Sequence, residues 1–355
     1  MRANLGMVAV VVLAACGLCA NCGRGAAQPD SRGHGGANAP VHKLTLRFAD
    51  LVNVDVRNVP LLMAFDELTK QGYDVETTHA IGATVPAELL VRGDADVAMF
   101  NNQTAWTAMA KGADIRTVAQ YTGSTSVLAA RDRIHGCGDL HHRPFGASSS
   151  TGTSPTLFAL YLDRHCPGTT PETVVIPQAE ARAAALVADR VDAAMMPLEQ
   201  LIRLQQQSLV PLHTLMSYAR EFPSVQIDGL HVRRSWAVDH PQAVKDLLRA
   251  QLEAHRQVRA NPQLLFDESQ RRLKIDAITA RAIGESHLRM DVWDANGGLT
   301  SERVQMTIDF LIAAKALPEG TTASRVADLS YLDAVLAEIG RLPDEAPQGE
   351  GPSSR

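Results

Sequence analysis

Strand-like and helix-like segments alternate along the first part of this chain, and this alternation restricts the fold more than any other feature of the sequence. Residues 43–48 (KLTLRF) alternate apolar and polar side chains, whereas residues 60–70 repeat apolar side chains at the spacing of one helix face. Further strand segments lie at 73–78 and 97–100, and further helical segments at 84–92 and 103–111. Such alternation is typical of a parallel sheet with helices on its faces. The sequence therefore predicts an α/β fold.

The same order of segments begins again in the middle of the chain. Its strand segments lie at 145–147, 174–176 and 193–196, and its helical segments at 154–165 and 179–189. At an offset of 96 residues, Leu90 matches Leu186, Asp96 matches Asp192 and Met99 matches Met195. The match is short, so the common pattern of α/β proteins is an alternative explanation. We favour two similar lobes, each a mostly parallel sheet flanked by helices.

The rest of the chain predicts how these lobes are connected. Extended runs at 117–130 and 226–232 look like two crossings of a hinge, and four amphipathic segments after residue 241 predict C-terminal helices. The expected parts are a signal peptide (1–15), a flexible tether (16–40), the first part of lobe 1 (41–122), lobe 2 (123–228), a return to lobe 1 with C-terminal helices (229–341) and a polar tail (342–355).

Composition narrows the classes of function. The chain has 355 residues, which is enough for two lobes that each bury a core. Its 34 basic and 39 acidic residues give a net charge of −5, and Lys and Arg form no nucleic-acid stripe. Aromatic residues make up only 5%, too few for a surface that stacks many bases or sugars. We therefore expect no nucleic-acid partner, and a small-molecule site remains.

The first residues have the pattern of an export signal. An apolar stretch at 7–15 (MVAVVVLAA) follows Arg2, and it is too short for a bilayer span of about 20 residues. Residues 13–16 (LAAC) resemble the bacterial lipobox, in which the cysteine is lipidated and becomes the first residue of the mature chain. We therefore predict lipidation of Cys16, which holds an exported protein at a membrane facing the periplasm or the cell exterior. The alternative is a simple secretory signal cut after Ala27.

The cysteines predict one disulfide. Cys16, Cys19 and Cys22 have the C-x2-C-x2-C spacing of an iron–sulfur ligand run, but the lipobox claims Cys16 and no fourth cysteine follows nearby. Cys137 precedes a predicted strand, and Cys166 follows the helix that returns antiparallel to that strand. Both therefore lie at one edge of a sheet. In an oxidising compartment we expect the two to be bridged.

A group of metal-ligating residue types surrounds the first of these cysteines. His135, Asp139, His141 and His142 accompany Cys137, and zinc accepts all of these side chains. Their spacing matches no known zinc site, so the disulfide and a plain solvated loop are the preferred interpretations. We expect no metal and no cofactor.

A run of small polar residues is the sharpest candidate for a binding site. Ligands in open α/β sheets bind beyond the carboxyl ends of the parallel strands, and residues 148–155 (SSSTGTSP) lie at such an end, just before a predicted helix. Hydroxyls, backbone N–H groups and the helix dipole together suit an anion or a polar oxygen. Helix capping is the alternative, but the run exceeds what a cap needs. The predicted contacts are Ser148, Ser150, Thr151, Gly152 and Thr153.

Other candidates follow the ends of the remaining strands. They are Phe48 and Asp50 after the first strand, Phe100 and Asn101 after the third, Met196 and Glu199 after the last strand of the second lobe, and Asp228 at the second crossing. The carboxylates of Asp50, Glu199 and Asp228, with that of Asp55, favour recognition of an amine or a hydroxyl group. The rings of Phe48, Phe100 and Tyr121 either sandwich a ligand ring or belong to the core. Asn102 and Gln103 offer further amides, and Arg57 is more often a solvated residue than an anion ligand at such a place.

Several segments together resemble one family. They are 43–48, 88–100 (ELLVRGDADVAMF), 139–153, 191–197 (VDAAMMP) and 298–331. These segments resemble the substrate-binding proteins of ABC importers, in the branch that handles nitrate, sulfonates, taurine and thiamine-pyrimidine precursors. The resemblance implies a two-lobed periplasmic-binding-protein fold of type II. It also implies a monomer that closes on a small organic solute and delivers it to permease and ATPase subunits, without catalysis.

Two alternatives belong to other classes. The first is an exported metal-dependent or nucleophilic enzyme on the same fold. A serine nucleophile requires a Gly-x-Ser-x-Gly elbow, and residues 146–150 (GASSS) lack the final glycine. The cysteine-rich motif of the eukaryotic pyrimidine synthase of this fold is also absent. The second alternative is a sensory lipoprotein that signals to a partner.

Overall fold

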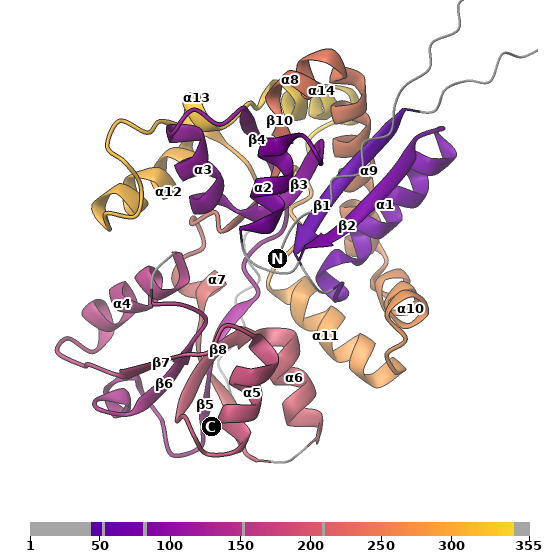
Figure 1. The fold of residues 1–355 in the computed structure, drawn as a ribbon. Helices are drawn as coiled ribbons and strands as arrows, with labels where there is room; N and C mark the ends of the chain where they lie inside the picture. The colour runs from indigo at the N-terminus through magenta and orange to yellow at the C-terminus, as the bar shows by residue number, and fades with distance from the viewer. Residues whose placement is uncertain (1–43, 52–53, 81–83, 151–152, 208–209, 344–355) are drawn as a thin grey trace, which may run out of the picture. The chain divides into compact units, whose positions relative to one another are not determined.

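A computed structural model describes residues 44–51, 54–80, 84–150, 153–207 and 210–343, with the side chains of Asp50, Leu51 and Ala80 left out. All of these residues belong to a single unit, Lys43–Arg355. This unit contains two five-stranded sheets flanked by helices (Figure 1). The α/β class predicted from the alternation of segments is therefore confirmed.

The first sheet, with its helices, forms lobe 1. Its strands are β1 (Thr45–Leu51), β2 (Asp74–Ala80), β3 (Val97–Asn101), β4 (Ile115–Gln120) and β10 (Asp228–Arg233). They lie in the order β2-β1-β3-β10-β4, with β1 parallel to its two neighbours and β10 antiparallel to both of its own. The central position of β10 means that the chain completes this sheet only after it has returned from the other lobe.

The second sheet repeats this plan in lobe 2. Its strands are β5 (Ser126–Arg131), β6 (Pro144–Ala147), β7 (Glu172–Val175), β8 (Ala193–Pro197) and β9 (Leu212–Ser217). Their order is β7-β6-β8-β5-β9, and the antiparallel strand β5 holds the place that β10 holds in lobe 1. Strands β3 and β8 begin and end 96 residues apart, so the sequence offset reflects two similar lobes.

Helices cover both sheets. Lobe 1 has α1 (Val59–Lys70), α2 (Val85–Arg92), α3 (Asn102–Ala110), α8 (Arg234–Asp239), α9 (Pro241–Ala260), α12 (Ser301–Ala313), α13 (Ala323–Val326) and α14 (Ser330–Ile339). Lobe 2 has α4 (Thr153–His165), α5 (Ala179–Val187), α6 (Leu198–Gln207) and α7 (Tyr218–Glu221). Between α9 and α12 lie α10 (Pro262–Leu273) and α11 (Ala277–Arg289). Helix α10, which begins at a proline suited to the first helical turn, is absent from the sequence-based prediction.

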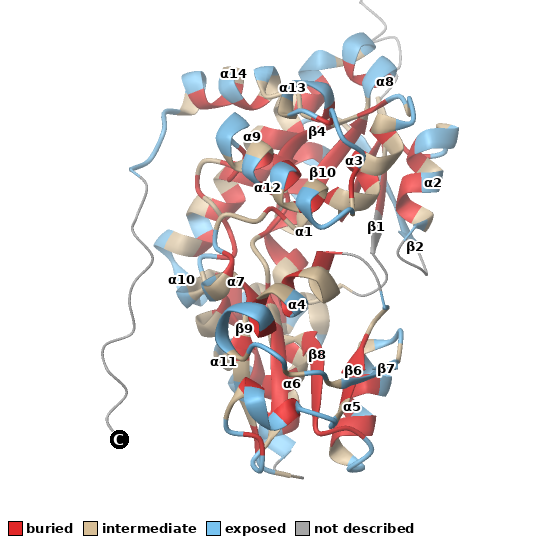
Figure 2. Ribbon diagram, turned by 90° about the vertical axis from the view of Figure 1, so that its left-hand side faces the viewer, coloured by how far each residue is buried: buried red, intermediate tan, exposed pale blue. Residues whose placement is uncertain are grey.

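Burial follows the pattern expected of sheets covered on both faces. Buried residues line the inner strands and the inner sides of the helices, whereas the outer helix surfaces and the edge strands β2 and β7 are largely exposed (Figure 2). In lobe 2, Met195 belongs to an apolar cluster on one face of the sheet, and Met196 belongs to the cluster on the other face. Successive residues of a strand point to opposite faces, so a sheet covered on both sides needs a continuous apolar run.

A disulfide joins Cys137 to Cys166, with 5.9 Å between the Cα atoms. The first cysteine lies in the 3-10 helix Cys137–Leu140, ahead of β6, and the second directly follows α4. The bridge therefore ties the amino end of β6 to the carboxyl end of the helix that covers it. In the part of the chain that the structure describes, no helix is long and apolar enough to span a membrane.

Candidate functional site

Among the described residues, side-chain hydrogen bonds cross between the two lobes near the carboxyl ends of their parallel strands. The carboxylate of Glu199, at the start of α6, accepts a hydrogen bond from the Val56 backbone N–H at 3.2 Å. The Thr153 hydroxyl donates to Gln103 Oε1 at 2.9 Å, and that of Thr279 in α11 donates to Gln206 Oε1 at 2.9 Å. We call the region between these contacts the inter-lobe junction.

The serine- and threonine-rich loop reaches this junction. Ser148 and Ser149 are half-buried after β6, Ser150 is exposed, and Thr153 is the first residue of α4. Thr151 and Gly152 lie outside the described residues. The Tyr218 hydroxyl donates to the Ser154 carbonyl oxygen at 3.2 Å, which fixes the first turn of α4. Part of the predicted loop therefore lies at the edge of lobe 2 that faces lobe 1.

The amides after β3 lie opposite this loop. Asn101 caps α3, since its Oδ1 accepts from the Gln103 backbone N–H at 3.0 Å, and the same oxygen lies 3.5 Å from the Thr153 hydroxyl. Asn102 is buried and donates through Nδ2 to the Gln226 carbonyl oxygen at 3.1 Å. The structure thus brings Asn101, Gln103 and Thr153 together, whereas Asn102 is directed at the hinge.

A half-buried ion cluster borders the junction on the side of lobe 1. Arg57, in the 3-10 helix Val56–Asn58, lies 3.6 Å from the carboxylate of Asp55 and 3.6 Å from that of Asp228. Burial opposes the charge of Arg57, but the carboxylates of Asp55 and Asp228 outweigh that effect and raise its pKa. Burial also raises the pKa of Asp228, against the influence of Arg57. The Arg57 charge therefore lies between two carboxylates, while its Nε is buried without a hydrogen-bond partner among the described residues.

Glu199 is matched in a similar way. Its second oxygen accepts from Arg203 Nη2 at 2.6 Å, one turn further along α6. Burial, together with the nearby carboxylate of Asp55, raises the pKa of Glu199. Glu199 and Asp228 therefore lie at the junction, as expected from the sequence, but both carry internal partners.

Three predicted contact residues belong to apolar cores instead. Phe48 is 1% exposed and packs edge-on against Phe65, and Phe100 is fully buried beside His231. Met196 lies in the core of lobe 2. The expectation that they face a ligand is corrected, because a strand covered on both faces directs its side chains into the two cores. Tyr121 is also buried, and its hydroxyl accepts from Asn58 Nδ2 at 2.7 Å. The side chain of Asp50, at the end of β1, lies outside the described residues.

An apolar cluster joins the lobes beside the ion cluster. Val56 and Val59 of lobe 1 share it with Ile202 of α6 in lobe 2 and with Ile283 and Trp293 of the C-terminal part. The Trp293 indole N–H donates to the Arg57 carbonyl oxygen at 3.1 Å. The His287 ring packs edge-on against this indole, with 5.7 Å between the ring centroids. His287 and Trp293 could not be predicted as junction residues, because a lone His or Trp on a helical or loop segment carries no local signal.

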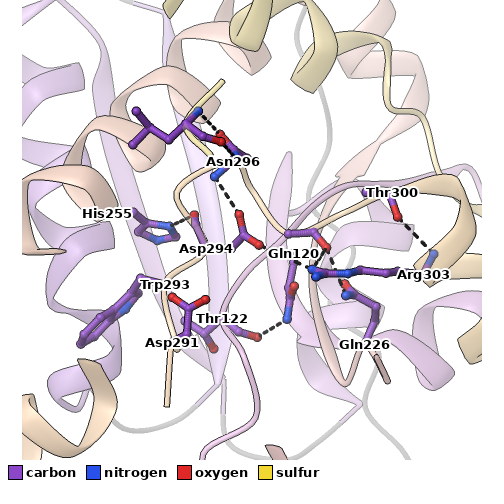
Figure 3. Close-up of polar contacts among 12 residues, drawn as sticks. Gln120, Thr122, Gln226, His255, Asp291, Trp293, Asp294, Asn296, Thr300 and Arg303 are labelled. Carbon is purple, nitrogen blue, oxygen red and sulfur yellow. Dashed lines mark hydrogen bonds and ion pairs between the residues drawn. The ribbon is translucent and has the colours of Figure 1, made fainter. Parts of the chain in front are cut away.

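A third segment of chain lies against both hinge crossings. The backbone N–H groups of Gln120 and Gly123 donate to the carbonyl oxygens of Gly297 and Val292, at 3.0 and 2.7 Å. From the second crossing, Gln226 Nε2 donates to the Gly298 carbonyl oxygen at 3.1 Å. Figure 3 shows Gln120 and Gln226, one from each crossing, beside the segment that carries Asp294. The segment 292–298 therefore links both crossings to lobe 1.

Side chains from lobe 1 hold this segment in place. His255 of α9 is hydrogen-bonded to the Asp294 carbonyl oxygen at 3.1 Å, and Arg303 of α12 pairs with the Asp294 carboxylate at 3.5 Å (Figure 3). Thr300 caps α12 by accepting from the Arg303 backbone N–H at 3.1 Å. The hinge is therefore stabilised by polar contacts from three parts of the chain.

The loop of potential zinc ligands has a structural explanation. The Asp139 carboxylate accepts from the backbone N–H groups of His135 and Gly136, at 2.8 and 3.1 Å. These bonds lower the pKa of Asp139. Within the described ranges, no three His, Cys, Asp or Glu side chains are grouped as they would be around a metal ion. Cys16, Cys19 and Cys22 lie outside the described residues, as do the predicted signal peptide and tether and most of the tail.

Comparison with known proteins places the chain in a family. The family model described as "NMT1/THI5 like" matches residues 68–264, more than half of the sequence. No curated protein sequence is detectably similar to the chain.

Solved structures share the fold at low sequence identity. A ligand-binding component of an ABC-type import system from Staphylococcus aureus, determined with zinc bound, is 14% identical over 82% of this chain and 99% of its own, with a TM-score of 0.67. The nitrate-binding protein NrtA from Synechocystis is 13% identical over 84% and 90%, with a TM-score of 0.66. The aliphatic sulphonate-binding protein SsuA from Escherichia coli is 14% identical over 88% and 97%, with a TM-score of 0.64. The two-lobed periplasmic-binding-protein fold is therefore confirmed.

We predict that Gly298→Ala destabilises the hinge. A Cβ at Gly298 would lie 2.1 Å from Gln120 Oε1, and Gly320→Ala is a matched control because its Cβ would meet nothing within 4 Å. Both glycines have positive φ, +63° and +77°, so both variants carry backbone strain of about 1–2 kcal/mol. We expect Gly298→Ala to lose about 1 kcal/mol more in urea unfolding, because the Gln120 side chain has to move and gives up its hydrogen bond to the Thr122 carbonyl oxygen. Equal losses in the two variants would contradict this account, and Gln120→Ala should restore part of the loss.

We predict an acid-side loss of stability that depends on His287. Burial lowers the pKa of His287 to about 4, and neither ring nitrogen has a hydrogen-bond partner among the described residues. In the unfolded chain His287 is protonated below about pH 6.5, whereas in the folded chain it stays neutral down to about pH 4. The free energy of unfolding therefore falls as the pH drops from about 6.5 to 4. His287→Phe should reduce this slope by one proton in urea unfolding at several pH values.

His255→Phe is the matched control for this prediction. Burial also lowers the pKa of His255 to about 4, so its removal reduces the slope in the same way. Its ring, however, is bonded to the Asp294 carbonyl oxygen, so this variant alone should lose about 1 kcal/mol at pH 7. An unchanged slope in His287→Phe would contradict the buried, neutral state of that ring.

Proposed function

The chain belongs to the NMT1/THI5-like family, and from this premise we propose that it is the solute-binding protein of an ABC importer, outside the cytoplasm. The observation that carries the proposal is the pairing of two strand-end loops across the lobes. Thr153 begins the helix after β6, Gln103 lies in the first turn of the helix after β3, and their side chains are 2.9 Å apart. A solute between such loops contacts both lobes at once.

The solute would be small, organic and polar. We propose that Asn101 and Gln103 from lobe 1, with Ser148, Ser150 and Thr153 from lobe 2, form its polar contacts, with Thr151 and Gly152 expected nearby. Hydroxyls, amides and the amino end of α4 suit an oxygen-rich headgroup. Two of the structures with this fold are described as binding nitrate and aliphatic sulphonates, which agrees with a solute of this kind.

Capture would work by closure of the lobes. A ligand that contacts both lobes favours the closed arrangement by its differential affinity for the two arrangements. The apolar cluster that Ile202 shares with Val56 and the hydrogen bond between Glu199 and Val56 would then stabilise closure from the protein side. No chemical step is proposed, and the expected partners are permease and ATPase subunits.

We further propose that Cys16 carries the lipid anchor. The apolar stretch at 7–15 supports it, as does the LAAC sequence at 13–16, in which cleavage falls directly before Cys16. The segment 17–40, rich in Gly, Ala and Pro, has the composition of a tether. An importer's binding protein must stay near its permease, and several acyl chains together hold a protein at the membrane.

We predict that one solute class raises the melting temperature of the protein. A solute at 100 times its Kd adds about 2.7 kcal/mol to the unfolding free energy. The panel comprises alkanesulfonates, taurine, nitrate, pyrimidine precursors and aromatic carboxylates. Ser150→Ala/Thr153→Ala should abolish the shift, whereas Thr322→Ala/Ser324→Ala, which removes hydroxyls on the short helix α13, should leave it unchanged. The proposal would be overturned if no compound of the panel raised the melting temperature, or if the protein chemically converted any of these compounds.

We predict that the full-length chain, expressed in a bacterial host, is labelled by a fatty acid at Cys16. The wild type should incorporate radiolabelled palmitate, because the lipobox cysteine is the residue that is acylated. It should also fractionate with membranes, because the acyl chains insert into the bilayer. Cys16→Ser should lose both the label and the membrane association, and Cys19→Ser is the matched control that should keep both. A soluble, unlabelled wild type cleaved after Ala27 would contradict the anchor.

A further inference from the structure

Arg182 is buried, and no carboxylate of the described residues forms an ion pair with it. It lies in α5 of lobe 2, is 6% exposed, and is the only arginine among the buried residues of the described ranges. Its Nε donates to the Met195 carbonyl oxygen at 2.6 Å, and its Nη1 donates to those of Ile176 and Pro177 at 2.6 and 2.8 Å. Burial lowers the pKa of Arg182, with Glu180 acting in the opposite direction. The positive charge is therefore stabilised mainly by three backbone carbonyl dipoles, with the Glu180 carboxylate acting from further away.

The guanidinium lies across the end of strand β6. Ile176 and Pro177 follow β7, and Met195 belongs to β8, while β6 lies between these two strands in the sheet. Strands β6 and β8 pair at Phe145–Ala193 and Gly146–Ala194, so the Met195 carbonyl oxygen is left for Arg182 just beyond this pairing. The Ile176 backbone N–H donates to the Ala147 carbonyl oxygen at 2.8 Å, directly before Ser148. The charge is thus placed beneath the start of the serine-rich loop.

This end of β6 faces lobe 1. Strand β6 is parallel to β8, and the residues just after β8 include Glu199, which is bonded to Val56 of lobe 1. After β6 the chain reaches Thr153, which is bonded to Gln103 of lobe 1. Arg182 therefore lies at the edge of lobe 2 that forms the inter-lobe junction.

One nitrogen of Arg182 remains available. Nη2 makes no hydrogen bond to any described residue, and it is not among the side-chain atoms that are buried without a partner. It therefore keeps contact with solvent. The other arginines of the junction described above are paired with carboxylates: Arg57 with Asp55 and Asp228, and Arg203 with Glu199. Arg182 differs in that it forms no ion pair with a described carboxylate, and its Nη2 has two N–H groups to offer.

We infer that Arg182 is the residue that selects the charge of the solute: its Nη2 binds an anionic headgroup seated on Ser148 at the amino end of α4. This inference rests on the proposed function and narrows its solute to organic anions. Three backbone carbonyls hold the planar guanidinium in one orientation, so little entropy is lost when the anion binds. The carboxylates of Glu199 and Asp228 have internal partners and do not oppose an anion as free charges would.

A purely structural role makes a different prediction. Arg256 has such a role: it donates to the carbonyl oxygens of Ala295, Ile339 and Gly340 at 3.0, 3.2 and 2.7 Å, at the end of α14 in lobe 1. It is the matched control, because it also clamps three carbonyl oxygens. If Arg182 only clamps carbonyls, its replacement should lower stability and leave discrimination between charged and neutral ligands unchanged.

The test uses methanesulfonate and acetate as anionic probes, with dimethyl sulfone and acetamide as their uncharged counterparts. Binding is measured by calorimetry on the intact protein at low ionic strength. We expect the anions to bind and the neutral probes to bind far more weakly. Arg182→Met should weaken anion binding about tenfold or more, Arg182→Lys should retain part of it, and Arg256→Met should leave it unchanged. Because Arg182→Met removes a buried clamp, guanidinium NMR of the wild type provides a second measurement, in which the Arg182 Nη signals should shift on anion addition.

The outcomes separate this inference from the proposed function. The inference would be overturned if Arg182→Met bound the anions as tightly as the wild type. It would also be overturned if the Arg182 NMR signals did not shift when an anion binds. An uncharged or cationic solute from the wider panel would leave the receptor function standing and overturn the role of Arg182. If neither the anions nor any panel solute binds, both fail.

Discussion

In each sheet, a buried carboxylate lies directly before the middle strand, which is β3 in lobe 1 and β8 in lobe 2. It holds neighbouring strands together at the end of the sheet that is far from the junction. Asp96, directly before β3, accepts from Arg47 Nε at 3.0 Å and from Arg233 Nη2 at 2.9 Å, which ties β1 and β10 to it. Asp192, directly before β8, pairs with Arg133 and Arg143 from the equivalent places in lobe 2. The carboxylates are buried and their arginines are partly exposed, so removing the arginines would leave a buried carboxylate without its ion pairs, and the strands start in fixed register. The carboxyl ends of the parallel strands in each sheet therefore lie together at the junction.

The predictable part of the fold is the part that local pattern specifies. Strands β3 and β8, the 96-residue offset and the helices α9, α11, α12 and α14 follow from periodicity, because their faces are buried along one element. Helix α10 and strand β9 were missed, since short or weakly patterned segments take their form from the neighbours they pack against. The loop at Ser148 was placed correctly at a strand end. Phe48 and Phe100 were misplaced, because position along a strand does not reveal which side chains face a core.

The junction depends on contacts between residues far apart in the sequence, which no local sequence pattern predicts. Arg57 is matched by Asp228 from the second crossing, and Trp293 is bonded to the Arg57 carbonyl oxygen from a segment more than 200 residues away. Ile202 completes an apolar cluster built mainly from lobe 1 and the C-terminal helices. Separation of the lobes would expose this cluster to water, at about 25 cal/mol for each Å² of apolar surface uncovered. The protein itself therefore contributes to the balance between arrangements that a solute would shift.

The place of β10 in the first sheet governs the order in which the chain can fold. All five strands of lobe 2 come from the continuous stretch 126–217, whereas the first sheet lacks its fourth member until residues 228–233 have been made. Long-range strand pairing requires a large loop to close first, which slows it. During synthesis or translocation, lobe 2 can therefore form while β3 and β4 still expose unpaired edges. These edges are where a nascent chain of this kind most needs protection from aggregation.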